Sequence, residues 1–272
     1  MPKTPNPLTE ALTEMTSSLK FELDHEERPV ESFVETALPG FKQTLIGRRS
    51  IRVYDGDPIP ENIMRDCLRD ATLAPSASNL QSYELYWIRD TEKKELISKA
   101  CLSQPPAITA GELVVVVARG DLWKVNLEKL VGILTNQGKQ PLPGPVNDYY
   151  TRIVPMIMRD DKFGFYNLVR RIHYWYTGLQ QPTMRTPVNR GDHRIYAHVQ
   201  AALVAQTLLL SLAAHGYESC PIGGMDEHRI HKILELPKKA EVSLVIAAGR
   251  GKPEGLYGPR VRLPEEDLIK EV

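Results

Sequence analysis

The sequence has few cysteines, no excess of charge of one sign and no long apolar run. Cys67, Cys101 and Cys220 are widely separated and form no CxxC pair, so we expect neither a disulfide framework nor a metal site. The 34 basic residues equal the 34 acidic residues. This balance argues against nucleic-acid binding and membrane-surface binding, because both need an excess of positive charge.

The longest apolar segment, residues 201–214, is too short to cross a bilayer and contains Gln206. We interpret it as part of a buried helix, and we expect no membrane span. The first 20 residues contain no apolar run, so we expect no secretory signal and a cytoplasmic location. Internal repeats and low-complexity tracts are absent from the sequence.

Regular structure is expected after Gly47, because residues 1–46 are a mixture of charges, prolines and scattered apolar positions. We interpret those residues as an arm with one short helix. Apolar spacing predicts helices after Pro60, from a cap at Thr91, over 195–215 with a stop at Gly216, and over 226–236. Runs of β-branched and aromatic residues predict strands at 83–90, 112–119 and 242–249. Three prolines and two glycines predict a loop over 137–147.

Two short segments near opposite ends of the chain carry alternating polar residues. Arg48, Ser50 and Arg52 would point to the same side of an extended backbone, and Arg260 and Arg262 repeat the pattern between prolines. Guanidinium groups that converge in this way suit a phosphate. The alternative is that the two segments are unrelated surface patches.

Two loops add polar and small side chains. APSASNLQS, residues 74–82, offers short hydroxyl and amide groups that can bond both backbone and ligand. CPIGGMD, residues 220–226, contains Gly223 and Gly224, which would let a flat ligand approach the backbone N–H groups closely.

RRSIR, APSASNLQ, PIGGMD and PRVRLP, in this order, resemble the motifs of the FMN-dependent nitroreductase family. The resemblance covers roughly residues 47–118 and 195–263. It implies an α+β fold with a central mixed β-sheet flanked by helices, in an intertwined homodimer with FMN at the interface. On this basis the FMN-binding domain is 47–263, its insertion is 121–194, and 264–272 form a C-terminal tail.

The resemblance also implies roles for individual residues. It places the cofactor's phosphate and ribityl chain on Arg48, Arg49, Ser50, Arg52, Arg260 and Arg262. It places Pro75, Ser76, Ala77 and Asn79 against the flavin from the other subunit. The turn Pro221, Ile222, Gly223 and Gly224 would bring a backbone N–H to flavin N5, with Gln104 at the pyrimidine edge. Ser82-Tyr83, Ala77 and Gly223 depart from the family's usual residues, which loosens any transfer of substrate preference.

The implied activity is reduction of a small organic acceptor, such as a nitroaromatic or a quinone, with NADH or NADPH as the electron donor. The cofactor performs the chemistry in this scheme, so no catalytic acid or base is assigned. Two alternatives remain. One is dehydrogenation, dehalogenation or oxygen-dependent chemistry on the same flavin, and the other is a non-catalytic FMN-binding protein.

Residues 149–176 hold eight of the chain's 19 aromatic residues. We expect Phe163, Phe165 and Tyr166 to contact an aromatic substrate, because they flank Gly164 in a segment, 160–168, that we interpret as a lid. We expect the group Tyr174 to Tyr176, which includes Trp175, to pack the insertion onto the core instead.

Overall fold

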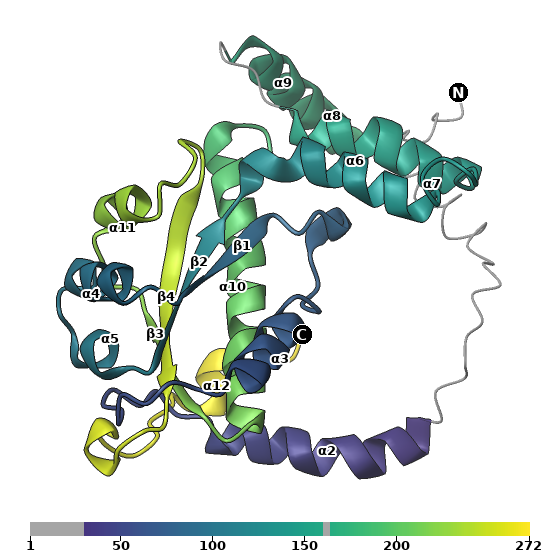
Figure 1. Ribbon diagram of the computed structural model, residues 1–272. Coiled ribbons are helices and arrows are strands. Elements are labelled where there is room, and N and C mark those ends of the chain that lie inside the picture. The colour runs from purple at the N-terminus through teal and green to yellow at the C-terminus, as the bar shows by residue number, and fades with distance from the viewer. Residues whose placement is uncertain (1–29, 160–163) are drawn as a thin grey trace.

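The computed structural model describes residues 30–159 and 164–272, and its centre is a four-stranded sheet with helices on both faces (Figure 1). The strand order is β1 (Tyr83–Ile88), β2 (Glu112–Ala118), β4 (Glu241–Gly249) and β3 (Glu218–Ile222). All three pairings are antiparallel. The parallel component is an isolated bridge between Ser50 and Ser219.

The central strand β2 is buried at all seven positions, which explains its sequence of consecutive apolar residues. Because side chains alternate across a strand, Val114 and Val116 enter the core on one face, while Val115 and Val117 enter the core on the other. The sheet therefore separates two cores.

Each core is closed by its own helices. On one face lie α10 (Arg190–Ala214) and α3 (Glu61–Ala71), which bring Leu208, Leu212 and Met64 to the sheet. On the other face lie α4 (Thr91–Ala100), α5 (Pro105–Thr109) and α11 (Glu227–Ile233). Figure 1 shows α4, α5 and α11 together on the side of the sheet opposite to α3 and α10.

The insertion forms a helical projection at the upper end of the molecule in Figure 1. Its elements are α6 (Trp123–Leu134), α7 (Gly144–Asp148), a π-helical turn (Tyr149–Ile153), α8 (Val154–Met158) and α9 (Phe165–Gln180). A third, small core of Leu80, Leu127, Val154 and Met158 joins the projection to the loop before β1.

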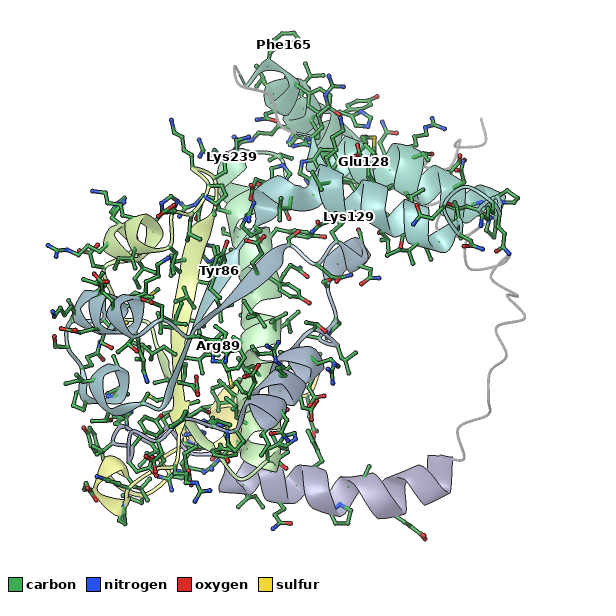
Figure 2. All side chains as sticks on the ribbon, in the orientation of Figure 1. Tyr86, Arg89, Glu128, Lys129, Phe165 and Lys239 are labelled. Carbon is green, nitrogen blue, oxygen red and sulfur yellow. The ribbon has the colours of Figure 1, made fainter. Side chains whose placement is uncertain are left out.

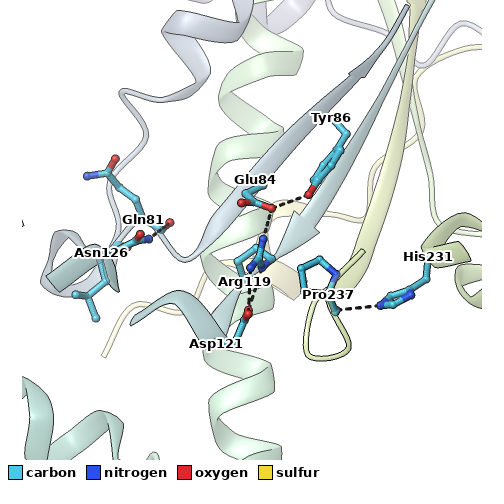
Figure 3. Close-up of polar contacts among 9 residues, drawn as sticks. Gln81, Glu84, Tyr86, Arg119, Asp121, Asn126, His231 and Pro237 are labelled. Carbon is cyan, nitrogen blue, oxygen red and sulfur yellow. Dashed lines mark hydrogen bonds and ion pairs between the residues drawn. The ribbon is translucent and has the colours of Figure 1, made fainter. Parts of the chain in front are cut away.

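A partly buried ion-pair network around Arg119 anchors the start of the insertion (Figure 3). The guanidinium of Arg119 donates two 3.0 Å hydrogen bonds to the carboxylate of Asp121 and one more to Glu84. The same Glu84 carboxylate accepts from the Tyr86 hydroxyl at 2.8 Å, and Asn126 donates to the backbone carbonyl of Gln81 at 3.2 Å. These contacts fix α6 relative to β1 and β2.

The strands expected at 83–90, 112–119 and 242–249 and the helices after Pro60, at 195–215 and at 226–236 are confirmed within one to five residues at their ends. Gly216 follows α10 with φ of +78°, as expected for a helix stop. The cap assigned to Thr91 is wrong, because the Asp90 side chain accepts the hydrogen bond from Lys93 N. The loop expected over 137–147 is wrong for its last four residues, because α7 begins at Gly144 and takes Pro145 into its first turn, where a proline is tolerated.

The arm carries more structure than expected. Helix α2 (Val30–Gly47) has 18 residues and extends away from the body along the lower edge in Figure 1. At the other end of the chain, α12 (Glu265–Leu268) is a single exposed turn. Strand β3 had no separate signal in the sequence, because its five residues include Pro221.

Helix α10 is long and apolar enough to cross a membrane by length and composition, the one such helix among the described residues. Half of that apolar stretch is buried inside the protein, which is typical of a core helix. One face nevertheless remains open, because Ile195, Val199 and Leu203 are exposed.

Candidate functional site

The two arginine-bearing segments lie side by side, although more than 200 residues separate them in the chain. Residues 50–55 run beside 250–255, where Arg52 N donates to Gly255 O at 3.0 Å and Lys252 N donates to Val53 O at 2.9 Å. Gly255 is required at this contact, because a Cβ there would lie 2.6 Å from Val53 N.

A cavity of about 290 Å³ opens between the two segments; we call it the arginine pocket. Its lining residues are Arg48, Arg49, Ser50, Arg52, Leu256, Tyr257, Gly258, Pro259, Arg260, Val261 and Arg262. Five arginines thus surround one small volume, and none of the described residues that line it is acidic.

The positively charged arginines in this pocket repel one another. Burial, together with the positive charges of Arg260, Arg262 and Arg49, lowers the pKa of Arg48 below the usual arginine value. A bound dianion would offset this repulsion and supply acceptors for the guanidinium donors. The arrangement is therefore that of an anion site.

The arginines do not all have free guanidinium groups. Arg260 donates to the backbone carbonyls of Ile46 and Arg48 at 2.7 and 2.8 Å, so it ties the C-terminal end of α2 to the tail segment. Arg49 donates to Gly258 O at 2.6 Å, and Arg52 lies 4.9 Å from the centre of the Tyr257 ring. Arg260 and Arg49 therefore shape the pocket as well as contributing charge to it.

Strand β3 leads from the base of this pocket to the glycine turn. Cys220 lies near Ser50, Arg48 and Arg52; burial raises the pKa of its thiol, and the two arginines oppose that shift. Pro221 and Ile222 end the strand, and Gln104 donates to the carbonyl of Gly224 at 2.6 Å. Gly223 has open space where a side chain would be.

The loop 74–82 lies apart from the arginine pocket. Ala77 N donates to the buried amide of Gln200 on α10 at 2.8 Å, and the Ser78 hydroxyl is 2.8 Å from the Tyr149 hydroxyl. Pro75, Ser76, Ala77 and Asn79 are described by the structure, and none of them lines the pocket. One chain thus brings together the arginines, but not the arginines and this loop.

Several residues with a positioning role were not predicted from the sequence. Gln200 is 4% exposed in the middle of an apolar helix, and it holds the loop 74–82. A buried glutamine in an otherwise apolar helix face is the signal that could have identified it. For Gly255 and Tyr257, the only indication in the sequence is their position close to the second arginine segment.

The aromatic segment differs from its expected placement. Tyr174 is buried as expected, but the expectation that Trp175 and Tyr176 pack on the core is wrong, because each is 59% exposed. Phe165 begins α9 at the upper tip of the molecule (Figure 2) and is 73% exposed. Tyr166 lies on the same helix, and Phe163 lies outside the described residues.

Comparisons with known proteins show which family this chain resembles. The model of the nitroreductase family matches residues 45–250. A Thermus thermophilus protein named NADH dehydrogenase is 28% identical over 240 residues, which is 87% of this chain and 98% of the relative. A provisionally named nitroreductase structure from Bacillus subtilis superposes with a TM-score of 0.67 at 22% identity, covering 86% of this chain and all of the other. Another, from Exiguobacterium sibiricum in complex with FMN, has a TM-score of 0.61 at 25% identity, covering 85% and 97%.

Proposed function

Since this chain belongs to the nitroreductase family and is thereby an FMN-dependent oxidoreductase, we propose that it takes electrons from NADH or NADPH and reduces a small organic acceptor of the nitroaromatic or quinone type. The single observation that carries the proposal is the arginine pocket, where both ends of the domain place cations around one small volume.

The residues of the pocket fit FMN. In this proposal Arg48, Ser50, Arg52 and Arg262 hold the phosphate, while Arg49 and Arg260 brace the backbone on either side of it. A cavity of about 290 Å³ is at the lower limit for a whole small-molecule ligand, commonly about 300–1,000 Å³. The flavin ring would therefore lie outside the pocket.

The glycine turn is the surface in this chain that suits a flat ring. Gly223 and Gly224 are exposed and present backbone rather than side chains, and Gln104 fixes the turn through the Gly224 carbonyl. FMN, when bound, supplies two-electron transfer between the nicotinamide donor and the acceptor. The chain's own residues bind, orient and cover the reactants, and no side chain is assigned as a catalytic acid or base.

We propose that a second copy of this chain completes the site. The exposed apolar residues of α10, Ile195, Val199 and Leu203, repeat at helical spacing and form one face. Such a face is typical of a subunit interface. In the homodimer, Pro75, Ser76, Ala77 and Asn79 of one chain would contact the flavin held by the other.

We also propose that the start of α9 contributes to substrate selection. Phe165 is exposed at the start of this helix, and Tyr166 is half-buried with the Arg159 and Arg170 guanidinium groups over its ring. Planar aromatic surfaces suit a planar acceptor. Phe163 belongs to this proposal by sequence alone.

The family and the half-buried apolar helix support a soluble protein, and the cytoplasmic location stays a prediction.

An anaerobic titration tests the activity directly. The FMN-loaded protein is mixed with NADH or NADPH while the absorbance of the oxidised flavin is followed, and a nitroaromatic or a quinone is then added. We expect stoichiometric bleaching by at least one nicotinamide and recovery by the acceptor. Bleaching by neither would favour the other flavin chemistries or a non-catalytic FMN-binding protein.

A further inference from the structure

A second and larger cavity lies at the opposite end of the sheet from the arginine pocket. Its volume is about 1020 Å³, and we call it the α10 cavity because the first two turns of α10 form one wall. The other walls come from the turn after β2, the end of α8, and the turn before β4. Figure 2 labels Lys239 of this last turn beside the upper end of α10.

Among the described residues that line the cavity, cationic side chains outnumber carboxylates. They are Arg159, Arg190, Arg194, Lys238 and Lys239. The carboxylates in its lining are Asp121 and Glu241. In a chain with no formal net charge, this is a local concentration of positive charge.

Both carboxylates are already engaged by cations of the protein. Asp121 receives two 3.0 Å hydrogen bonds from Arg119. The Glu241 carboxylate accepts hydrogen bonds from Arg194 Nε at 2.7 and 2.8 Å, and it lies 3.1 Å from His198 Nε2. Arg190, Lys238 and Lys239 are exposed, and their charges are not offset by these two carboxylates.

The cavity also has an apolar part. Ala118, Met158 and Ala197 line it and are otherwise buried, and the indole of Trp123 lies beside them. A Trp ring gives a planar apolar ligand a large stacking surface. Cationic groups on one side and apolar groups on the other suit a ligand with anionic substituents on a planar body.

The size excludes a simple inorganic ion as the matching ligand. Pockets for small organic molecules are commonly about 300–1,000 Å³, and the α10 cavity is at the upper end of that range. The cavity is also separate from the proposed subunit interface. Arg190, Arg194 and Ala197 follow helical spacing along one side of α10, whereas Ile195 and Val199 lie on another.

We propose that the α10 cavity is a binding site for a planar organic polyanion of nucleotide size, with phosphates held by Arg190, Lys238 and Lys239 and the ring placed against Trp123. Two sources share this chemistry: a free adenine nucleotide and the phosphorylated adenosine end of a dinucleotide donor. The proposal does not depend on the identity of the acceptor or on the flavin chemistry.

Isothermal titration of the full chain, with excess FMN to occupy the arginine pocket, tests the proposal. The probes are ADP, adenosine 2′,5′-bisphosphate and inorganic phosphate. We expect saturable binding of both nucleotides, and binding of inorganic phosphate at least about tenfold weaker, because it gains nothing from the apolar wall. A preference for the 2′,5′-bisphosphate identifies the adenosine end of NADP(H) as the source. Equal or tighter binding of ADP leaves a free nucleotide or the adenosine end of NAD(H), and NAD⁺ as a competitor distinguishes them, because only the dinucleotide source predicts that NAD⁺ displaces ADP.

Variants locate the site. Lys238→Ala with Lys239→Ala removes two exposed charges and should weaken nucleotide binding roughly tenfold to thirtyfold. Lys93→Ala with Lys99→Ala is the control, since it removes the same charge from α4 on the other face of the sheet. Absence of saturable nucleotide binding, phosphate binding as tight as ADP, or equal loss in both double variants would overturn the proposal.

Discussion

The arginine pocket and the helical insertion lie at opposite ends of the molecule, and they differ in how far a single chain completes them. At the pocket, backbone hydrogen bonds join residues 50–55 to 250–255, and Arg49 and Arg260 add side-chain bonds across the same seam. In the insertion, α9 leaves a continuous apolar face open. Its exposed members are Phe165, Leu168, Val169, Ile172, Trp175, Tyr176 and Leu179.

This contrast separates what one chain stabilises from what it leaves for another molecule. The pocket is shaped by contacts within the chain, so its geometry exists before any ligand arrives. The open faces of α9 and α10 expose apolar surface in the single chain, and burying it against a second copy would be favourable by about 25 cal/mol per Å². The four predictions that follow, in order of decreasing effect, test this difference.

The largest effect is expected at the open face of α10. Val199→Asp with Leu203→Asp should convert the proposed dimer into monomers, because an unpaired charge buried at an interface costs several kcal/mol. Light scattering measures the mass. Leu96→Asp on α4 is the control, because Leu96 is 41% exposed and Leu203 is 40% exposed. A dimer that persists in the double variant would show that the subunits meet elsewhere.

The next largest effect concerns the charge of the arginine pocket. Arg48→Ala should weaken FMN binding roughly tenfold to hundredfold, since a hydrogen bond to a charged group contributes about 1.5–3 kcal/mol. The FMN-free protein should keep its stability, because the change also removes repulsion among the arginines.

Arg260→Ala should lower both the affinity for FMN and the stability of the FMN-free protein, because Arg260 donates hydrogen bonds to the backbone carbonyls at the end of α2. Flavin fluorescence gives the affinity and urea unfolding gives the stability. Arg69→Ala, an exposed arginine on α3, controls for the loss of one charge. If Arg48→Ala retained full FMN affinity, the phosphate would have to be held elsewhere.

A third prediction tests the backbone contact between residues 50–55 and 250–255. Gly255→Ala should lower the free energy of unfolding by about 1–3 kcal/mol, because the new Cβ would meet Val53 N and Ile51. Gly223→Ala is the matched control, with open space around its Cβ and an expected change within about 0.5 kcal/mol. Equal unfolding midpoints for the two variants would mean that residues 50–55 and 250–255 can move apart without loss of stability.

The smallest effect is expected at the tip of the insertion. Phe165→Ala and Tyr166→Ala should change the ranking of acceptors by kcat/KM several-fold while FMN content stays at the parental value, since neither residue lies in the arginine pocket. Kinetics with a nitroaromatic and two quinones of different size measure the ranking. An unchanged ranking in both variants would place substrate selection elsewhere, for example on α2.

Most of the sheet and the core helices could be predicted because their sequence patterns are local. The run of valines in β2 and the apolar spacing after Pro60 reflect burial by the chain itself. The arginine segments could be paired because both alternate and both suit one phosphate. That they do line one cavity agrees with the prediction, and their role toward FMN stays a proposal.

What the sequence did not predict depends on contacts between distant parts of the chain. The roles of Arg260 as a brace and of Gln200 as the support of the loop 74–82 come from such contacts. Trp175 and Tyr176 were expected to pack on the core because they are aromatic, yet the part of the chain that the structure describes leaves both of them exposed. Composition predicts that such residues avoid water, but not which molecule covers them.

A mixed dimer tests the central claim, a site built from two chains, most directly. One chain carries Arg48→Ala with Arg262→Ala, and the other carries Asn79→Asp, which replaces the amide of the loop that the partner's flavin would meet. Each homodimer is expected to bind FMN at least about tenfold more weakly than the parent. Differently tagged chains, purified as the heterodimer, are then titrated with FMN.

If the loop of one chain completes the pocket of the other, one site carries all the changes and the second site is intact. The account predicts one FMN per heterodimer at the parental affinity. Two weakened sites, with none at the parental affinity, would show that each site is formed by a single chain and would contradict it.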